Sequence, residues 1–293
     1  MNIEDYTNEL ENFEKMAELL KASREEMPEV KGIDIYGEVN PFNGSTGGDH
    51  IVYVDFKKRY DLDKMIESAT SNNIKSELEK LKYKAGIMVA DAAGHNITDF
   101  FHVAQLHQVF LTGSLYELEF FGNITTKLFE HMNTRFFKSA QITKFMTMIY
   151  GEIDENGQFK FISAGHEKPI IFSNQYNKIM SIDDKLIEQY PPLGTMPSSF
   201  DMVITKTKGR IGEKSNYKVS ELKLMGSGDI LLLYTDGLSD QYAANDVKFK
   251  ERIEKIMRET KKKPAKEIYQ SIKDDFKSTG EQVDDISYVI IKK

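Results

Sequence analysis

The sequence predicts an α+β fold in which antiparallel sheets pack against each other and helices lie outside them. Short apolar segments with the length of strands follow one another through most of the chain, and tight turns such as residues 154–158 join some of them. Predicted helices also follow one another in pairs, without a strand between them. A doubly wound fold would instead alternate strands and helices regularly, so two packed sheets are favoured.

The first predicted element is a helix over residues 2–28. Apolar residues recur at alternating three- and four-residue steps, only Arg24 interrupts the series, and Pro28 ends it. The series consists of Ile3, Tyr6, Leu10, Phe13, Ala17, Leu20 and Met27. This spacing is typical of a short coiled-coil seam. Met16 and Leu19 widen the stripe, as expected for a helix that packs on its own domain, so both interpretations stay open.

Eight strands and five more helices are predicted beyond residue 32. The strands are residues 33–39, 50–56, 85–91, 145–154, 159–165, 169–173, 229–235 and 286–293, and the helices are residues 61–82, 98–111, 116–136, 247–258 and 265–277. The charged stretch within residues 61–84 has no strong apolar face, which indicates a solvated insertion. We therefore expect a helical segment over residues 1–30, with a possible regulatory role, and one domain over residues 31–293.

The composition limits the class of function. The chain has 293 residues, of which 40% are hydrophobic, so it can bury a sizeable core. A formal net charge of −7 argues against a nucleic-acid partner. The absence of cysteine excludes disulfides, thiolate zinc sites and cysteine nucleophiles. No segment resembles a signal peptide or a membrane span, so we expect a cytoplasmic protein.

Acidic residues stand where predicted strands stop or start. Asp49 precedes one strand, Asp91 and Asp236 end two others, and Asp284 and Asp285 precede the last. A single Asp at a strand end is ordinary turn or cap chemistry, but several can converge at one edge of a sheet. Close carboxylates raise one another's pKa, and cations relieve that repulsion. Oxygen ligands favour hard ions, so the pattern predicts a site for Mg²⁺ or Mn²⁺.

Six motifs occur in an order and at an approximate spacing that are found together in a known protein family. They are "GGDHIVYVDF", "VADAAGH", "TMIYGEID" with "FISAGHEKPIIF", "PPLGT", "GSGDILLLYTDGLSD" and "VDDISYVIIKK". From about residue 33 to residue 293 the chain resembles the SpoIIE/RsbU-type branch of the metal-dependent (PPM class) serine/threonine protein phosphatases. The resemblance implies an α/β/β/α sandwich that holds two Mn²⁺ or Mg²⁺ ions at one end of its sheets.

The resemblance also implies a ligand set. The residues are Asp49, which binds one ion directly or through water, the bridging Asp91, the backbone carbonyl of Ala92, Asp236 and Asp284. Asp91 and Asp236 would be the catalytic pair, and Asp285 is the less favoured alternative to Asp284. Gly47 and Gly48 would let the backbone turn closely enough to aim Asp49 at the ions. The chain departs from the family at "ADAAGHN", where Gly-Asp-Val-Ser-Gly is usual, and its charged insertion makes the interval from Asp49 to Asp91 longer than the minimal family pattern.

Two ions would supply the chemistry without a protein nucleophile. They lower the pKa of a water from about 15.7 toward roughly 7 and hold the phosphate oxygens. Among the histidines, His166 is expected to support the site, and His95 to cap a loop or donate a proton. His102 and His107 point about 140° apart on one helix, so they are expected to pack rather than share a metal.

The function implied is hydrolysis of phosphoserine or phosphothreonine on a partner protein, by water activated at the ions, in bacterial partner-switching signalling. The substrate could be a phosphorylated antagonist of an anti-sigma factor. An alternative is a signalling or scaffold module that keeps the fold but has little turnover, and a two-metal nuclease is disfavoured by the lack of a basic stripe. The N-terminal helix could form a homodimer and couple a signal to the domain.

Overall fold

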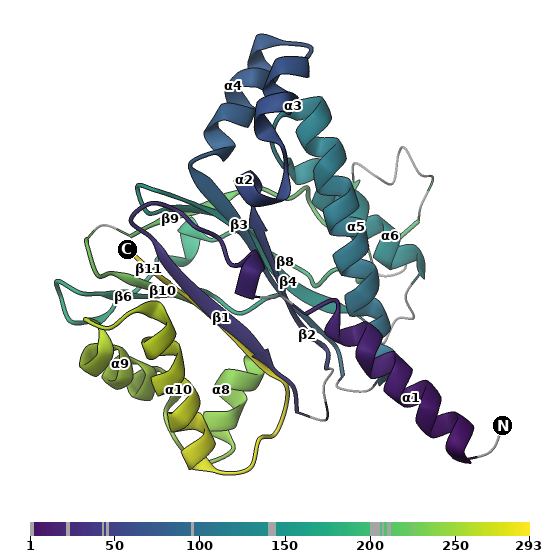
Figure 1. Ribbon diagram of the computed structural model, residues 1–293. Helices are drawn as coiled ribbons and strands as arrows, with labels where there is room; N and C mark the ends of the chain where they lie inside the picture. Colours follow the sequence, from purple (N-terminus) through teal and green to yellow (C-terminus); the bar gives the residue numbers. More distant parts are fainter. Residues whose placement is uncertain are drawn as a thin grey trace.

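The computed structural model confirms the α+β class, with two sheets packed face to face between two layers of helices (Figure 1). The structure describes residues 3–21, 24–42, 44, 47–94, 97–139, 145–199, 206, 208–209, 212–224 and 226–293. One end of each sheet carries the strand ends where the acidic residues of the sequence motifs stand. The fold therefore matters chiefly for how it brings these two edges together.

The first sheet has five strands in the order β1-β11-β10-β6-β7, and every neighbouring pair is antiparallel. Its strands are β1 (Asp34–Asn40), β11 (Ile286–Lys292), β10 (Ile230–Tyr234), β6 (Ile170–Ser173) and β7 (Lys178–Ile179). The first and last strands of the domain lie side by side, since β1 pairs with β11 along its whole length.

The second sheet has the order β2-β3-β4-β5-β8, and β9 also pairs with β5. Its strands are β2 (Asp49–Asp55), β3 (Lys84–Ala92), β4 (Met146–Asp154), β5 (Gln158–Ala164), β8 (Gln189–Tyr190) and β9 (Ser220–Lys223). All pairs are antiparallel except the two-residue contact of β5 with β8. The short strands β7, β8 and β9 escaped prediction because β7 and β8 have only two residues each and β9 has a single apolar residue, Leu222.

Helices cover the outer face of each sheet (Figure 1). On the β2-to-β5 sheet these are α2 (Phe56–Arg59), α3 (Leu62–Ser68), α4 (Asn72–Leu81), α5 (Ile97–Phe121) and α6 (Thr126–Ser139). On the other sheet they are α8 (Asp236–Ala243), α9 (Phe249–Thr260) and α10 (Ala265–Thr279). Side chains such as Ile87, Leu231 and Val289 are fully buried between the two sheets.

The N-terminal helix is shorter than the predicted 2–28. Helix α1 (Ile3–Glu18) ends near the point where it packs on the domain, and a 3-10 turn, η1 (Arg24–Glu26), follows. The Phe13 ring lies edge-on to Phe100 at 5.4 Å, and Ala17 is fully buried. Met27 packs instead against the core between the sheets, which one straight helix could not also reach. The division at residues 30 and 31 stays a prediction.

The predicted helix over residues 61–82 is two helices, α3 and α4. Ser71 begins α4, because its side chain accepts a hydrogen bond from the Ile74 amide and caps the helix. Ile74 and the residues four and seven positions later, Leu78 and Leu81, are buried in the core beneath the helices. The expectation of a solvated insertion is therefore wrong for this face, since three apolar positions on one side are enough to anchor a short helix.

The boundary between the two central helices was also misplaced. The sequence suggested a break near Gly113, whereas α5 continues to Phe121 and ends at Gly122, which has a φ of 74°. A Cβ at Gly113 would lie 2.3 Å from Cδ1 of Leu128, so this glycine serves the close approach of α6. Gly122 has the left-handed conformation that commonly ends helices.

A buried ion pair fixes the segment after β8 to α6. Nζ of Lys214 lies 2.8 Å from Oε2 of Glu130, and the two side chains are 2% and 4% exposed. Glu130 also accepts hydrogen bonds from the Ser198 hydroxyl and the Tyr217 amide, and Lys214 stands 3.3 Å from the centre of the Tyr217 ring. These bonds compensate the loss of hydration that burial imposes on both charges.

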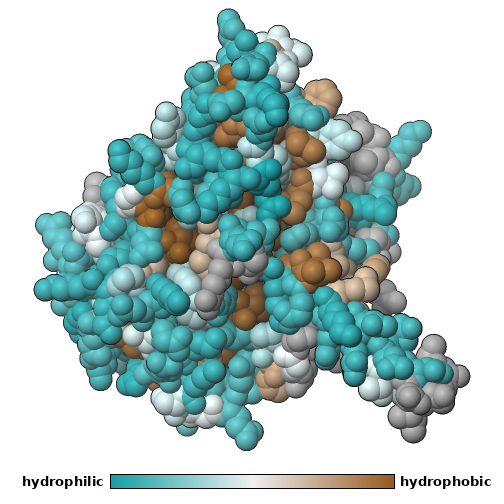
Figure 2. Space-filling model, in the orientation of Figure 1, coloured by the Kyte–Doolittle hydropathy of each residue, from teal (hydrophilic) through white to brown (hydrophobic). Residues whose placement is uncertain are grey.

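No helix within the described ranges is both long enough and apolar enough to cross a membrane. Figure 2 shows that hydrophilic residues dominate this face of the molecule, and that they cover most of the part of α1 that projects from the domain.

We expect Ile87→Ala to destabilise the fold by about 2–5 kcal/mol, because it opens a cavity where both sheets contribute apolar side chains. Val219→Ala is the control, since this valine is 52% exposed and its loss should change the free energy of unfolding by less than about 0.5 kcal/mol. Urea unfolding monitored by circular dichroism measures both. Equal losses for the two variants would contradict the assigned core.

Candidate metal centre

Both sheets deliver carboxylates to the same place. Asp49 at the start of β2 is the direct partner of Asp91 near the end of β3. Asp236 begins α8 immediately after β10, and Asp284 and Asp285 lead into β11. After burial, the negative charges of Asp236, Asp284 and Asp285 raise the pKa of Asp91. The carboxylates of the β10–β11 sheet therefore lie near the carboxylates of the β2–β3 sheet. We call these five residues the carboxylate cluster.

Asp49 is the most enclosed member of the cluster, with 5% of its surface exposed. Burial raises its pKa well above the ordinary range, and the charges of Asp91 and Asp285 raise it further. The Thr235 hydroxyl donates a hydrogen bond of 2.8 Å to Oδ2 of Asp49, which opposes this rise. Thr235 follows β10, so this bond connects the two sheets directly at the cluster.

Asp91 and Asp236 are also pushed toward their neutral forms. Burial, followed by the other carboxylates, raises the pKa of Asp91 to about 8. Burial raises the pKa of Asp236 as well, with further contributions from Asp240, Asp284 and Glu167. At neutral pH the cluster therefore holds charges that the folded protein disfavours, and a divalent cation would stabilise them.

The two adjacent aspartates before β11 have different surroundings. Asp285 is 4% exposed, and its carboxylate accepts hydrogen bonds from the Phe42 amide at 2.6 Å and the Gly48 amide at 2.7 Å. Asp284 is half-buried and accepts a bond from the Asp285 amide at 2.8 Å. Asp285 thus holds the backbone that leads into β2. This favours Asp284 as the ion ligand, and its choice stays a prediction.

The glycines of two motifs are required by close packing around Asp285 and around the end of β3. A Cβ at Gly47 would lie 2.2 Å from Oδ2 of Asp285, and one at Gly237 would lie 1.9 Å from the Asp285 carbonyl oxygen. A Cβ at Gly48 would meet the carbonyl oxygens of Gly94 at 2.3 Å and Ala92 at 2.7 Å. Close approach, rather than an unusual φ, is therefore the reason for glycine at these positions.

The donor atoms of the cluster fit hard divalent cations. They are oxygens, and the Ala92 carbonyl stands beside the turn at Gly48. Burial, and after it the neighbouring carboxylates, raise the pKa of three of the aspartates, and bound cations would oppose both effects. Within the ranges that the structure describes, no three His, Asp or Glu side chains already stand in an arrangement that would hold an ion. The assignment of Asp49, Asp91, Ala92, Asp236 and Asp284 as ligands therefore stays a prediction.

His166 lies behind the cluster. Its Nδ1 is 2.9 Å from the hydroxyl of Thr147, and Thr147 is the strand partner of Asp91. Burial lowers the pKa of His166 to about 3, although the Tyr234 backbone opposes the shift, so the imidazole is neutral at physiological pH. This agrees with a supporting role for the ring.

Of the other histidines, His102 packs on a neighbouring ring, and His107 forms a pair with His50 that the sequence did not predict. His107 lies 2.9 Å from His50, through Nδ1 and Nε2, and joins α5 to β2, whereas His102 contacts the ring of Phe101. Burial lowers the pKa of both His50 and His107. His95 lies outside the described residues. Sequence reasoning missed the His50 contact because no local pattern links residues 57 positions apart.

The family model of Stage II sporulation protein E (SpoIIE) matches residues 82–293. The chain belongs to the SpoIIE family. No curated protein matches the sequence at a significant level.

Solved structures place the SpoIIE-family domain among phosphatase folds of the PP2C type. One neighbour comprises the PP2C phosphatase domain and a regulatory fragment of SpoIIE from Bacillus subtilis, with 15% identity and a TM-score of 0.61. The match covers 93% of this chain and 64% of that structure, so the chain spans less than two-thirds of it. The SiaA-PP2C domain of Pseudomonas aeruginosa has 13% identity and a TM-score of 0.61, with 99% and 98% covered.

A third neighbour has been solved with metal. It is the catalytic domain of the serine/threonine protein phosphatase PstP in complex with two manganese ions, at 10% identity and a TM-score of 0.51, covering 89% of this chain and 97% of that one. At such identities the likeness establishes the fold, and it confirms the expected sandwich of this SpoIIE-family member.

Without divalent metal, we expect the protein to lose stability as the pH rises from about 4 to 8. The pKa of Asp91 is raised to about 8, so in this window the folded state binds more protons than the unfolded state, and the free energy of unfolding falls with pH. The slope from one such group is about 1 kcal/mol per pH unit.

Asp91→Asn should flatten this slope and stabilise the metal-free protein at pH 8, whereas Asp274→Asn on α10 is the control that should not. Urea unfolding in EDTA at several pH values measures the effect, and added Mn²⁺ should raise the melting temperature of the unmodified protein. A metal-free protein that is equally stable at pH 5 and pH 8 would argue against the strain assigned to the cluster.

Proposed function

We propose that this chain is a metal-dependent phosphatase that hydrolyses phosphoserine or phosphothreonine on a partner protein. The observation that supports it most is the convergence of carboxylates from two sheets at one edge, with the pKa of Asp49, Asp91 and Asp236 raised. Membership of the SpoIIE family and the PP2C-type fold agree with this function.

In this proposal four aspartates of the carboxylate cluster and one backbone carbonyl hold two Mn²⁺ or Mg²⁺ ions. The residues would be Asp49, Asp91, the Ala92 carbonyl, Asp236 and Asp284. When bound, such ions lower the pKa of water, orient the phosphate and stabilise the charge that develops during displacement. Asp91 lies in β3 of one sheet and Asp236 begins α8 after β10 of the other, so together they would hold the reacting phosphate between the two sheets.

Other residues orient the ligands. Thr235 holds Asp49 through its hydroxyl, and Asp285 holds the turn that carries Asp49 through the Gly48 amide. His166 is kept neutral by burial and contacts Thr147 beside Asp91. These contacts limit the movement of the carboxylates before any substrate binds, which is the usual role of groups behind a catalytic site.

A phosphoprotein substrate fits a family whose members act in signalling. We place this chain in a bacterial partner-switching pathway, where the substrate would be a phosphorylated antagonist of an anti-sigma factor. One observation favours a second candidate, a module with little turnover, because no three described side chains already form an ion site. Mn²⁺-dependent hydrolysis of a small aryl phosphate distinguishes an active phosphatase from a module with little turnover.

We expect Mn²⁺-dependent hydrolysis of a small aryl phosphate, and no cleavage of single-stranded DNA. Asp91→Asn and Asp236→Asn should each reduce the rate at least about 10²-fold while circular dichroism stays unchanged, because the charge is removed without core volume. Asp274→Asn, an exposed change of the same kind on α10, should retain the rate.

Substantial Mn²⁺-dependent turnover in either cluster variant would show that the metal assignment is wrong at that position. An inactive unmodified protein with a normal fold would favour the module with little turnover. DNA cleavage that depends on Asp91 would favour a nuclease instead.

The projecting part of α1 is proposed to form a homodimer and transmit a signal to the domain. Leu10 on the projecting part is 44% exposed, and Met16 beside the docked residues is 68% exposed, so both leave apolar surface that the domain does not cover. Phe13 and Ala17 already pack on the domain, which divides the helix into a docked half and a projecting half.

Leu10→Glu should therefore convert a dimer to a monomer at micromolar concentration and leave the melting temperature nearly unchanged. Phe13→Ala is the contrasting variant, because it removes the contact with Phe100 and should lower the melting temperature. Light scattering and thermal unfolding measure both variants. A monomeric unmodified protein would refute the dimer.

A further inference from the structure

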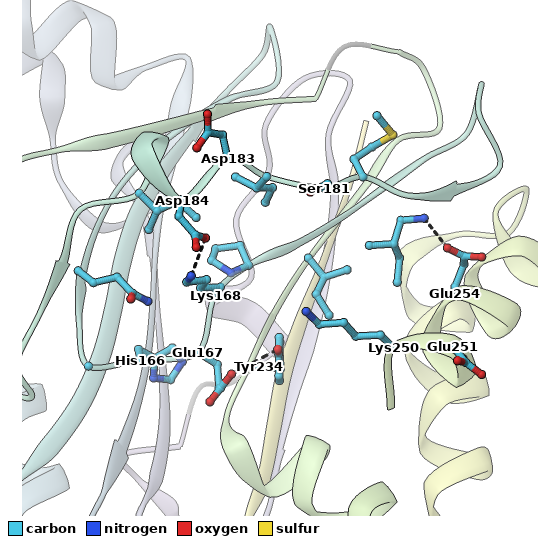
Figure 3. A pocket seen from close by; sticks show the side chains of 18 of the residues that line it. His166, Glu167, Lys168, Ser181, Asp183, Asp184, Tyr234, Lys250, Glu251 and Glu254 are labelled. Carbon is cyan, nitrogen blue, oxygen red and sulfur yellow. Dashed lines mark hydrogen bonds and ion pairs between the residues drawn. The ribbon is translucent and has the colours of Figure 1, made fainter. Parts of the chain in front are cut away.

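A cleft of about 1120 Å³ opens beside His166 and Tyr234 (Figure 3). Its walls are the turn between β5 and β6, the segment between β7 and β8, and the start of α9. Sites for drug-sized ligands measure roughly 300–1,000 Å³. The cleft is therefore much larger than a phosphate group requires, and it has room for several residues of a polypeptide.

The inner end of the cleft adjoins the cluster. Tyr234 lines the cleft and stands two residues before Asp236. Its hydroxyl donates a hydrogen bond of 3.4 Å to Oε2 of Glu167, which also lines the cleft. Glu167 also follows His166, whose Nδ1 lies 2.9 Å from the hydroxyl of Thr147, the strand partner of Asp91. A substrate polypeptide with its phosphate at the carboxylate cluster would thus have Glu167 beside the residues next to its phosphoserine.

Most charged side chains in the cleft already have an opposite charge beside them. The ion pairs are Lys168 with Asp184 at 2.7 Å, Lys248 with Glu251 at 3.0 Å, and Arg258 with Glu254. A further acid, Asp183, caps the short 3-10 helix η2 (Asp184–Leu186) by accepting a bond from the Lys185 amide. These charged side chains form the walls of the cleft. Each would have to give up an existing contact in order to bind a ligand.

Two charged side chains of the cleft form no ion pair with the described residues, although the charge of Lys250, after that of Lys168, helps to lower the pKa of Asp184. Glu167 makes only the hydrogen bond from Tyr234, and Lys250 on α9 makes no ion pair. Both side chains are exposed. Figure 3 shows Lys250 reaching from α9 toward the side of the cleft that Glu167 and Lys168 line. The cleft thus offers one negative and one positive group from different walls.

A buried polar atom also lies at the inner end. His166 is 4% exposed and lines the cleft, and Thr147 occupies its Nδ1. Its Nε2 makes no hydrogen bond of ordinary geometry with the described residues, although the Tyr234 backbone is close enough to affect the ring. Buried polar atoms rarely stay unpaired, so a group from a ligand is a suitable partner.

We propose that this cleft binds the residues flanking the phosphoserine of the substrate protein, with Glu167 pairing with a Lys or Arg next to the phosphoserine and Lys250 with an acidic residue further along. The inference rests on the proposed phosphatase function and specifies its substrate class. Opposite charges placed in this way give selectivity among polypeptides more than they give affinity.

The test uses short fluorescent peptides that carry a non-hydrolysable phosphonate in place of phosphoserine, so that binding is read without turnover. The neighbours of the phosphonate are varied among Arg, Ala and Glu, and the more distant positions among Glu, Ala and Lys. Fluorescence anisotropy gives Kd for each peptide with the unmodified full chain and with Glu167→Lys, Lys250→Glu and Glu251→Gln.

We expect the unmodified protein to bind peptides with a neighbouring Arg about tenfold more tightly than those with Glu. Glu167→Lys should reverse this order, and Lys250→Glu should reverse only the preference at the distant positions. Glu251→Gln is the control in the same cleft, because Glu251 is already paired with Lys248, and it should change neither preference.

Three results would overturn the inference: no preference in the unmodified protein, the same preference in Glu167→Lys, or an equal effect of Glu251→Gln. The fate of the phosphatase proposal is read separately from Mn²⁺-dependent hydrolysis of the aryl phosphate. If the protein hydrolyses the aryl phosphate but shows no peptide preference, only the proposal for the cleft is refuted. If it shows the peptide preference but no hydrolysis, only the phosphatase proposal is refuted.

Discussion

The hydrogen bond from Thr235 to Asp49 is the contact on which the candidate site depends. Thr235 accepts a bond from the Ser287 amide at 3.0 Å and donates one to Asp49 at 2.8 Å, so a single hydroxyl ties two strands of one sheet to the first strand of the other. Asp285 completes the junction by accepting bonds from the Phe42 and Gly48 amides. The junction forces like charges together, at a cost in stability that the cores on either side of it must offset.

This arrangement explains why the site lies at the edge of the sandwich and not in its interior. The cores between and outside the sheets are apolar and would not tolerate several carboxylates. At the edge, strands end, helix α8 begins, and glycines let backbone and carboxylate approach closely. The same edge opens into the cleft with Glu167, so the chemistry of the phosphate and the choice of polypeptide are proposed to occur side by side.

The sequence alone predicted the strands well and the helix limits poorly. Alternation, apolar runs and strand-end aspartates are local signals, so the eight predicted strands and the convergence at one edge could be expected. Gly113 looked like a helix break because the contact with Leu128 that explains it comes from another helix. Met27 continued the spacing of α1 but belongs to a different core. Glu167 and the His50 contact with His107 were missed, since each acquires meaning only from residues distant in the chain.

The buried pair of Lys214 and Glu130 has a consequence for how this sequence can evolve. Losing either partner leaves the other charge buried and unpaired, which is commonly more harmful than replacing both with apolar groups. Glu130 also holds the Tyr217 amide and the Ser198 hydroxyl, so its loss would release more than one bond. Positions 130 and 214 should therefore change together among relatives, and a lineage could pass between charged and apolar versions only through a double substitution or a poorly folded intermediate.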